Sequence, residues 1–520
     1  MNTFANDPLL EMRRSSVRSG LRSALDQLDV SLPIEAPALI GSSRGDIDGL
    51  ISVDPGNPSR VVAVAGDSSS GDVDRAVEAA QAGFRMWGVT SARERAVVLG
   101  RAAAIMRQTR QQLTAMIVRE CGKPWIDADA EVCEAIDFIE YYARQSVGLE
   151  RTPELLQLPG ERNEMRFVPR GVVAVIAPWN FPLAISAGMV VAGLATGNSV
   201  IYKPAEQTPG IGHELVSILR SAGVPDDVIG FVPGGDEPGK RLVEHPDIHT
   251  IAFTGSCAVG LEIIARSAAL AAGQNHLKRV VAEMGGKNCL IVDSDADLDE
   301  VIPAAVHSAF GFAGQKCSAA SRLLVHDAVF DHLAERLTGA VSSVLTGQAE
   351  DFGIDLGPVI DPDSAERHAR YLDQASQDGE ILATGGGLPA GDGYFCAPTV
   401  VSGLPDDSKL LADEVFAPLV TIERVADLES ACALVEASPF ALTAGLFTRN
   451  PEHARKVEAR SPVGNLYINR GITGAMVGRQ PFGGNRLSGT GTKAGGPGYL
   501  TAFVEPRVVC ENTMRHGLVV

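Results

Sequence analysis

The run Val172-Val173-Ala174-Val175-Ile176-Ala177 is continuously apolar, and Pro178-Trp179-Asn180-Phe181-Pro182 follows it directly. An apolar run of this length is typical of a parallel strand that is buried on both faces. The two prolines and the tryptophan then predict a rigid turn at the carboxyl end of the strand, where α/β sheets bind ligands. In this turn Asn180 could donate its amide to an oxyanion, although a plain turn asparagine is the commoner role.

Helix and strand patterns alternate at short intervals on both sides of this turn. Between Val73 and Ala80 the apolar residues follow helical spacing, and Ser70 and Asp72 are candidates for the helix cap. This alternation predicts a doubly wound α/β domain. Further helices are expected at residues 92–121, 127–142, 183–195, 210–221 and near 240. Strands are expected at 172–177, 199–202, 228–232 and 249–253.

A second α/β region begins near Glu283. Its pattern predicts strands at 289–292 and 322–325, with a helix at 298–311 between them. The first 50 residues are weakly patterned, so we expect an extended arm with one short helix from Ser16 to Leu28. The stretch 499–509 is expected to form an exposed strand that pairs with another subunit.

The composition is that of an ordinary globular chain with a strongly acidic balance. The length of 520 residues is enough for two or three folded units. Hydrophobic residues make up 45% of the chain, which is ordinary for a globular protein. The formal net charge of −19 repels phosphate backbones, so we expect no nucleic-acid partner. The most apolar stretch, 183–195, is too short to cross a bilayer, so we expect a buried helix and no membrane partner.

Eight cysteines are scattered along the chain without a CxxC pair. This spacing argues against a disulfide framework and a zinc site, and it favours a reducing, cytoplasmic location. We therefore expect no metal ion. Cys257, Cys289 and Cys432 are expected to be buried structural residues.

Two charged residues after one predicted strand are candidates for a dinucleotide site. Lys203-Pro204-Ala205-Glu206 follows the strand at 199–202, and the Glu206 carboxylate would accept hydrogen bonds from a ribose with a free 2′-hydroxyl. The same carboxylate would repel a 2′-phosphate, which favours NAD over NADP. An exposed ion pair is an equally reasonable interpretation of this motif taken alone.

Glycines near the next two strands would permit a backbone to approach a pyrophosphate closely. Gly234, Gly235 and Gly239 precede one helix, and Thr254-Gly255-Ser256 precedes the next. The GxGxxG fingerprint is absent from this region, so glycine spacing alone does not establish a Rossmann site. Ordinary glycine turns stay open as the alternative.

Two further residues have side chains suited to covalent chemistry. Glu283 precedes Met284-Gly285-Gly286-Lys287, and a glutamate held on a glycine-rich turn can act as a general base. Cys317 follows a predicted helix among small neighbours, which give a nucleophile the access it requires. Taken singly, an exposed turn carboxylate and a buried structural cysteine are the commoner roles of such residues.

Taken together and in order, these motifs resemble the aldehyde dehydrogenase superfamily over roughly residues 50–510. The resemblance implies an α/β fold with a Rossmann-type cofactor domain, an α/β catalytic domain and a small β oligomerisation element. Ala417 departs from the usual glycine of the superfamily, and Asn485 follows Gly484 where other residues are common. The matching segments are Ala177-Pro178-Trp179-Asn180-Phe181-Pro182, Lys203-Pro204-Ala205-Glu206, Phe253-Thr254-Gly255-Ser256, Glu283-Met284-Gly285-Gly286-Lys287, Gly314-Gln315-Lys316-Cys317, Glu414-Val415-Phe416 and Pro481-Phe482-Gly483-Gly484.

The resemblance also implies a division of the chain. We expect an N-terminal arm at 1–50 and an NAD-binding domain at 51–282, with part of the oligomerisation element near 143–170. A catalytic domain is expected at 283–480. Residues 481–520 are expected to return to the cofactor domain and to end in an oligomerisation strand, so a homo-oligomer is expected.

Three longer stretches narrow the resemblance to the Δ1-pyrroline-5-carboxylate dehydrogenase family. They are HLKRVVAE at 276–283, AFGFAGQKCSA at 309–319 and VGNLYINRGITGA at 463–475. In that family, NAD-dependent oxidation turns L-glutamate γ-semialdehyde, which is in equilibrium with 1-pyrroline-5-carboxylate, into L-glutamate during proline degradation.

The resemblance implies a role for each matching residue. Cys317 would attack the aldehyde to give a thiohemiacetal and then a thioester, the Asn180 amide and the Cys317 N–H would hold the oxyanion, and Glu283 would activate water. Cofactor contacts are implied for Ile176, Ala177, Pro178, Trp179, Lys203, Glu206, Gly235, Gly239, Thr254, Gly255, Ser256, Glu414 and Phe416. Substrate contacts are implied for Phe181, Ser318, Thr473, Gly474 and Ala475.

Two other functions stay open. An aldehyde dehydrogenase for another small aldehyde, such as succinate semialdehyde, would share the same catalytic residues. A catalytically silent scaffold homologue is less consistent with the presence of Cys317, Glu283 and Asn180. Some relatives carry a fused proline dehydrogenase domain; we expect any such partner here to be a separate protein.

Overall fold

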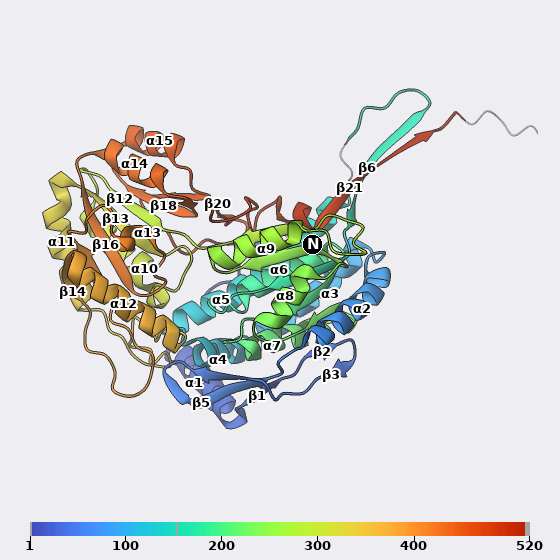
Figure 1. The fold of residues 1–520 in the computed structure, drawn as a ribbon, viewed down its shortest axis with the longest axis horizontal. Helices are drawn as coiled ribbons and strands as arrows, with labels where there is room; N and C mark the ends of the chain where they lie inside the picture. The colour runs from blue at the N-terminus through green and yellow to red at the C-terminus, as the bar shows by residue number, and fades with distance from the viewer. Residues whose placement is uncertain (1–2, 152–153, 515–520) are drawn as a thin grey trace, which may run out of the picture.

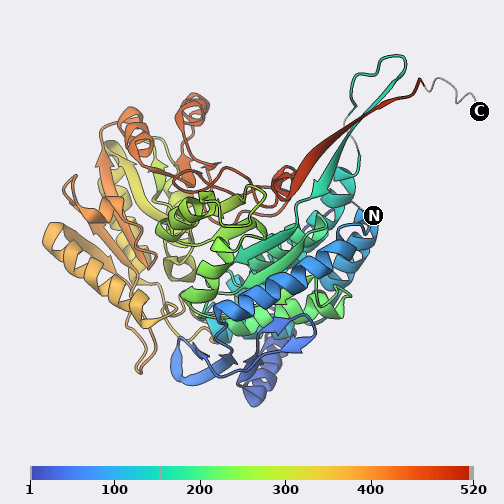
Figure 2. The same cartoon turned by 45° about the vertical axis from the view of Figure 1, so that its right-hand side comes forward.

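The computed structural model of the protein describes residues 3–151 and 154–514. The expected segments that reach residues 1–2, 152–153 or 515–520 lie outside the described residues at those positions. Figures 1 and 2 show two α/β lobes side by side, with a two-stranded ribbon projecting from the first lobe. Each lobe is built around its own seven-stranded sheet. Within the described residues, no helix is long and apolar enough to cross a membrane.

The first sheet confirms the prediction of a parallel strand at 172–177. Its order is β11-β10-β7-β8-β9-β2-β3, and the strands from β11 to β9 are all parallel. Because β7 lies between two partners and is covered on both faces, its residues from Val172 to Val175 are buried. The strands are β11 (Arg279–Glu283), β10 (Ile248–Thr254), β7 (Val172–Ile176), β8 (Ser199–Lys203), β9 (Ile229–Phe231), β2 (Leu39–Ile40) and β3 (Ser43–Arg44).

The first 50 residues have more structure than the expected arm with one helix. The helix is α1 (Ser15–Ser31), which packs against α4 (Arg110–Cys121) with Leu21 and Leu25 in the main core. Strand β2 pairs with β9 and β3 extends the first sheet. A small sheet forms from β1 (Ile34–Ala36), β5 (Asn57–Ala65) and β4 (Leu50–Asp54). Strands β1, β2 and β3 have only three, two and two residues, which is why the sequence pattern missed them.

The helices of the first lobe follow the predicted pattern with three corrections. The cap of α2 is Ser69 rather than Ser70, and Asp72 completes the capping box. The predicted 92–121 helix is two helices that meet at Thr109, and the predicted 127–142 helix is longer at both ends. The further helices are α2 (Ser70–Trp87), α3 (Ala92–Gln108), α5 (Trp125–Leu149), α6 (Ala184–Ala195), α7 (Pro209–Ser221), α8 (Asp236–Glu244) and α9 (Cys257–Ala268).

The second lobe has the strand order β14-β15-β16-β13-β12-β18-β19, parallel except at β14. The strands are β14 (Glu380–Thr384), β15 (Thr399–Ser402), β16 (Leu419–Val425), β13 (Ala320–His326), β12 (Asn288–Val292), β18 (Thr443–Phe447) and β19 (Asn465–Ile468). The helices are α10 (Leu298–Phe310), α11 (Asp327–Ser342), α12 (Pro362–Asp378), α13 (Lys409–Ala412), α14 (Leu428–Ala437) and α15 (Pro451–Arg460). A short 3₁₀ turn, η1 (Gly311–Gly314), follows α10, and β17 (Phe440–Ala441) pairs with β20 (Asn485–Arg486).

The predicted strand at 499–509 was placed too early. Residues Tyr499–Phe503 form a 3₁₀ turn (η2), in which the Tyr499 ring stacks on Tyr142 in the core and also contacts the Phe503 ring. Strand β21 (Val504–Asn512) begins only where the chain leaves that core. It pairs antiparallel with β6 (Glu161–Pro169) of the same chain, and most of its residues are exposed.

All eight cysteines are free thiols, as their spacing predicts. Cys289 and Cys432 are buried, which confirms those two assignments. Cys257 is not fully buried, because it occupies the first turn of α9, directly after the exposed Ser256 at the helix cap.

Mutations in α1 test whether this helix packs in the main core. Leu25 is 1% exposed, whereas Val30 near the end of the same helix is 88% exposed. We expect Leu25→Ala to lower the free energy of unfolding by about 2–5 kcal/mol and to lower the thermal unfolding temperature clearly. Val30→Ala is the matched control, with an expected change within about 0.5 kcal/mol. Equal thermal stability of the two variants would contradict the packing described here.

Candidate active site

The three predicted catalytic residues come from three separate segments that meet between the lobes. Asn180 lies in the turn after β7, Glu283 is the last residue of β11, and Cys317 lies between η1 and β13. The Asn180 Nδ2 atom donates to the Gln315 carbonyl oxygen at 3.0 Å. The Glu283 charge acts on the Cys317 thiol, whose pKa it helps to raise. The structure therefore brings all three side chains to one place.

Asn180 and Cys317 retain donors for an oxyanion. The Asn180 amide has two N–H groups and its hydrogen bond to Gln315 uses one of them. Within the described residues, the backbone N–H of Cys317 donates to no protein atom. Asn180 is only 5% exposed, so its remaining donor faces a site with little competing water.

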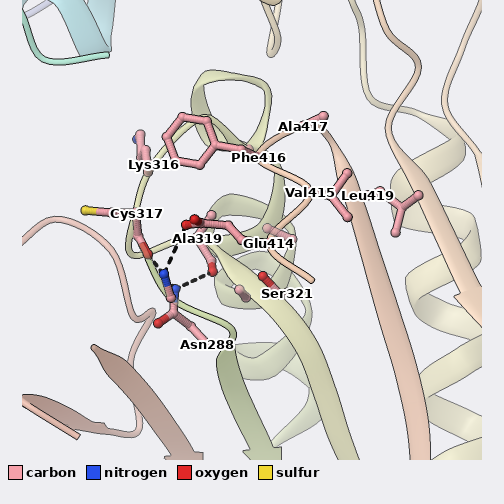
Figure 3. Close-up of a pocket in the computed structure, with 14 residues that line it drawn as sticks. Asn288, Lys316, Cys317, Ala319, Ser321, Glu414, Val415, Phe416, Ala417 and Leu419 are labelled. Carbon is pink, nitrogen blue, oxygen red and sulfur yellow. Dashed lines mark hydrogen bonds between the residues drawn. The ribbon is translucent and has the colours of Figure 1, made fainter. Parts of the chain in front are cut away.

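The loop that carries Cys317 is held in a strained and well-anchored conformation. Phe312 (φ 53°) and Ala313 (φ 54°) have left-handed backbones, which cost energy unless the surroundings enforce them. Asn288 enforces the next part, because its Nδ2 donates to the carbonyl oxygens of Cys317 (2.7 Å) and Ala319 (2.9 Å), as Figure 3 shows. The loop is thus anchored at the carbonyl group of the nucleophile itself and again two residues later.

The Cys317 thiol is protonated at neutral pH in this state. Burial raises its pKa to about 12, and the carboxylates of Glu414 and Glu283 add to the shift. Figure 3 shows the sulfur pointing away from Glu414 and Phe416, on the other side of the loop. A thiol of this kind forms its reactive thiolate only when its proton is removed or a nearby positive charge lowers its pKa.

The surroundings of Glu283 suit a general base. Burial raises its pKa to about 8, against the hydrogen bond from Gly484 and the charge of Lys493. One oxygen, Oε2, accepts from the Gly484 N–H at 2.8 Å, and the other, Oε1, is buried without a partner among the described residues. A carboxylate with a free oxygen and a pKa near the working pH can take a proton from water.

The residues predicted to hold the adenine end of a dinucleotide lie along the carboxyl edge of the first sheet. Lys203 is buried, and among the described residues its Nζ atom donates only to the Pro204 carbonyl oxygen at 3.1 Å. Burial lowers the pKa of Lys203, and the nearby Glu206 carboxylate opposes this shift. Glu206 is exposed. An ammonium group with unused donors beside an exposed carboxylate suits the hydroxyls of a ribose.

The helix that begins after Ser256 suits a pyrophosphate. Ser256 is exposed and caps α9 by accepting from the Val259 N–H at 3.3 Å. The first turn of α9 contains no acidic side chain, so the positive end of the helix dipole is available to an anion. An ideal Cβ at Gly235 would meet no atom within 4 Å, which leaves open space near this edge.

Three of the predicted cofactor residues, Trp179, Glu414 and Phe416, form a compact group near the nucleophile. The rings of Trp179 and Phe416 meet edge to face, with centroids 5.6 Å apart. Glu414 Oε1 accepts from the Gly286 N–H at 3.0 Å, and burial raises the Glu414 pKa to about 7. An ideal Cβ at Gly285 would lie 1.8 Å from Glu414 Oε2, which explains the glycine there.

The two departures from the superfamily pattern are both accommodated. Ala417 is buried, and its carbonyl oxygen accepts from the Leu419 N–H at 2.7 Å. Asn485 bridges two loops, because its Nδ2 donates to the Pro462 oxygen and its Oδ1 accepts from Lys493. Neither residue blocks the group around Cys317.

The predicted substrate loop has unused backbone donors. Ile472 is anchored by its N–H bond to Ser308 at 3.1 Å. Among the described residues, the N–H groups of Thr473, Gly474 and Ala475 donate to no protein atom. Gly474 has a φ of 78° and is exposed, so its backbone is open to a ligand. A run of free N–H groups of this kind suits a carboxylate.

Helix α5 contributes charged residues that the sequence analysis missed. Asp127, Glu131 and Glu134 recur at the spacing of one helix face, which is the signal that could have revealed them. Asp127 pairs with Lys316 beside the nucleophile at 2.7 Å, and Glu131 pairs with Lys123 at 2.5 Å. Burial, together with the Glu131 carboxylate, raises the pKa of the half-buried Glu134 to about 8. The Glu134 charge also acts on Cys317.

The model of the aldehyde dehydrogenase family matches residues 45–509, so the chain belongs to this family. It is 40% identical over 510 residues to 1-pyrroline-5-carboxylate dehydrogenase 2 of Bacillus subtilis, covering 98% of this chain and 99% of that protein. The crystal structure of 1-pyrroline-5-carboxylate dehydrogenase from Thermus with bound NAD has a TM-score of 0.96 at 40% identity, with 98% and 99% of the two chains covered.

A longer protein is also similar. The crystal structure of proline utilization A (PutA) from Bdellovibrio bacteriovorus matches with a TM-score of 0.97 at 42% identity. The match covers 99% of this chain but only 54% of that one, so this chain spans about half of its length. Fold class and family are therefore those that the sequence motifs predict.

The high pKa of Cys317 leads to a test on the protein without substrate. Because only the thiolate reacts with iodoacetamide, we expect labelling of Cys317 to accelerate about tenfold per pH unit between pH 7 and 9. The rate is followed by mass spectrometry of the Cys317 peptide, with the exposed Cys510 in the same sample as the reference. A labelling rate that reaches a plateau below pH 8 would contradict the buried, protonated thiol.

Proposed function

We propose that this chain oxidises L-glutamate γ-semialdehyde to L-glutamate with NAD, as a dehydrogenase of proline degradation. The observation that carries the proposal is the meeting of Cys317, the Asn180 amide and Glu283 in one site beside a loop with free backbone donors. Full-length relatives at about 40% identity bear the name 1-pyrroline-5-carboxylate dehydrogenase, which supports the choice of substrate.

The geometry supports covalent catalysis by Cys317. The thiol gives up its proton to solvent water as the sulfur adds to the aldehyde carbon, and the Asn180 amide and the Cys317 N–H hold the oxyanion of the thiohemiacetal. Bound NAD supplies the acceptor for the hydride that leaves this carbon, so that a thioester results. Glu283 then takes a proton from water through its free Oε1, and the water oxygen attacks the thioester to release the acid.

The cofactor is assigned to the carboxyl edge of the first sheet. Lys203 and Glu206 hold the adenine ribose, Ser256 and the first turn of α9 meet the pyrophosphate, and Glu414 with Phe416 places the nicotinamide ribose. The remaining predicted contacts complete this edge; they are Ile176, Ala177, Pro178, Trp179, Gly235, Gly239, Thr254 and Gly255. The exposed Glu206 carboxylate disfavours a 2′-phosphate, which supports NAD over NADP.

Both charged groups of the substrate have a complementary partner. The free N–H groups from Thr473 to Ala475, with Ser318 beside the nucleophile, bind the α-carboxylate. Glu134 supplies a carboxylate for the α-ammonium group, because its charge acts on the Cys317 site and its side chain is half-buried. Phe181 adds an apolar wall beside the chain of the substrate.

We further propose that the β6–β21 ribbon is an oligomerisation element of a homo-oligomer. The ribbon projects from the first lobe in both views (Figures 1 and 2). Val508 and Val509 of β21 are exposed apolar residues on it. The working division is an N-terminal segment at 1–50, a cofactor domain at 51–282, a catalytic domain at 283–480 and a returning segment from 481.

Eight free thiols suit a reducing cytoplasm, and a separate proline dehydrogenase would supply the substrate.

Substrate preference tests this function directly. We expect kcat/KM for glutamate semialdehyde to exceed that for succinate semialdehyde by at least about tenfold. Succinate semialdehyde has no amino group, so it offers Glu134 no partner. NADH absorbance gives the rates.

Cys317→Ala should abolish NADH formation and keep NAD binding, with the buried Cys432→Ala as the control that stays active. Equal preference for the two aldehydes would contradict the proposed substrate. Turnover by Cys317→Ala would contradict the proposed nucleophile.

A further inference from the structure

A fully buried ion pair lies behind the turn that carries Asn180. Lys123 Nζ and Glu131 Oε2 are 2.5 Å apart, and both side chains are 0% exposed. Lys123 lies between α4 and α5, and Glu131 lies in the second turn of α5. Neither residue contacts a reacting atom in the mechanism described above.

Stability alone does not explain such a pair. Removing two charges from water is costly, and apolar residues of similar size in the same place are often as stable or more so. A buried pair is therefore informative about what its atoms hold in place. The remaining hydrogen bonds of Lys123 and Glu131 point to that role.

Lys123 contacts both segments that form the oxyanion site. Its Nζ atom donates to the Asn180 carbonyl oxygen at 2.7 Å. The same ammonium group lies 3.8 Å from the centre of the Phe181 ring and 4.5 Å from that of Phe312. Phe181 follows Asn180, and Phe312 belongs to the left-handed turn that leads to Cys317. One cation thus joins the Asn180 turn to the nucleophile loop.

Glu131 fixes the other end of the Asn180 turn. Its Oε1 atom accepts from the N–H groups of Leu183 at 2.9 Å and Ala184 at 3.2 Å. Those N–H groups lie at the start of α6, which is buried except at Ile185, and no side chain within α6 caps this end. The ion pair therefore holds residues 180–184 at both ends, with its charges compensating each other.

We propose that Lys123 and Glu131 are positioning residues that hold the Asn180 amide at the oxyanion site. The inference rests on the proposed function, in which Asn180 stabilises the oxyanion. Because the backbone of Asn180 is pinned by Lys123, its side chain reaches Gln315 and the site from a fixed origin. Without the pair, the turn and α6 still fold against the apolar core, but the amide loses its alignment.

The test removes both charges at once and measures catalysis and folding separately. Lys123→Met/Glu131→Gln keeps similar volumes and leaves an oxygen for the Leu183 and Ala184 N–H groups. We expect NAD affinity and thermal stability near those of the wild type. The single-turnover rate of NADH formation and kcat should fall about 10- to 100-fold, with less than about a threefold change in KM.

A double-mutant cycle identifies Asn180 as the target. Asn180→Ala alone should lower the single-turnover rate about 100-fold. If the pair acts through Asn180, adding Lys123→Met/Glu131→Gln to this variant should cost less than about a further threefold. Equal fold losses in both backgrounds would overturn the proposal, as would wild-type rates in Lys123→Met/Glu131→Gln. Should that variant fail to bind NAD, Glu131→Gln alone serves, and an unchanged rate there likewise contradicts the proposal.

A second ion pair on the same helix is the matched control. Asp129 of α5 accepts two hydrogen bonds from Arg110 of α4, both at 2.7 Å, and one from the Leu10 N–H. Arg110→Met/Asp129→Asn should leave the rate of NADH formation unchanged, and an equal loss there would overturn a specific role for Lys123 and Glu131. Wild-type speed in Asn180→Ala would instead refute the oxyanion role in the proposed function, which distinguishes the two failures.

Discussion

The hydrogen bond from Asn180 Nδ2 to the Gln315 oxygen joins two segments that belong to different sheets. Asn180 lies in the turn after β7 of the first sheet. Gln315 lies two residues before the nucleophile, in the loop that leads into β13 of the second sheet. An oxyanion site built from Asn180 and the Cys317 N–H exists only where these segments meet. Three features hold these segments in place: the proline-rich turn, the left-handed residues before Cys317 and the Asn288 hydrogen bond to the Cys317 carbonyl oxygen.

The same closeness explains the electrostatics of the site. Burial raises the pKa of Glu283, Glu414, Glu134 and Cys317. For the three carboxyl groups, burial outweighs nearby cations such as Lys493 and Lys287, which act to lower the pKa. Their negative forms oppose one another, so the site without ligands favours protonated thiol and carboxyl groups. A cationic α-amino group or a polarised carbonyl brought by a substrate would relieve this opposition.

Much of this arrangement was predictable from local sequence. The apolar run at 172–177 predicted the central strand, and the ordered motifs predicted the family and gathered Asn180, Glu283 and Cys317. Local patterns could not reveal strands as short as Leu39–Ile40, whose pairing with β9 is set by tertiary contacts. They also did not reveal the Lys123–Glu131 pair, because its contacts with Asn180 and Leu183 depend on tertiary structure that no spacing rule displays.

The most direct measurement of the central claim traps the covalent intermediate in Glu283→Gln. This variant keeps the nucleophile and the oxyanion donors but lacks the base that activates water. After mixing with glutamate semialdehyde and NAD, we predict one rapid equivalent of NADH and a glutamyl thioester on the Cys317 peptide, detected by mass spectrometry. Steady NADH formation at the wild-type rate, with no adduct on Cys317, would contradict the account.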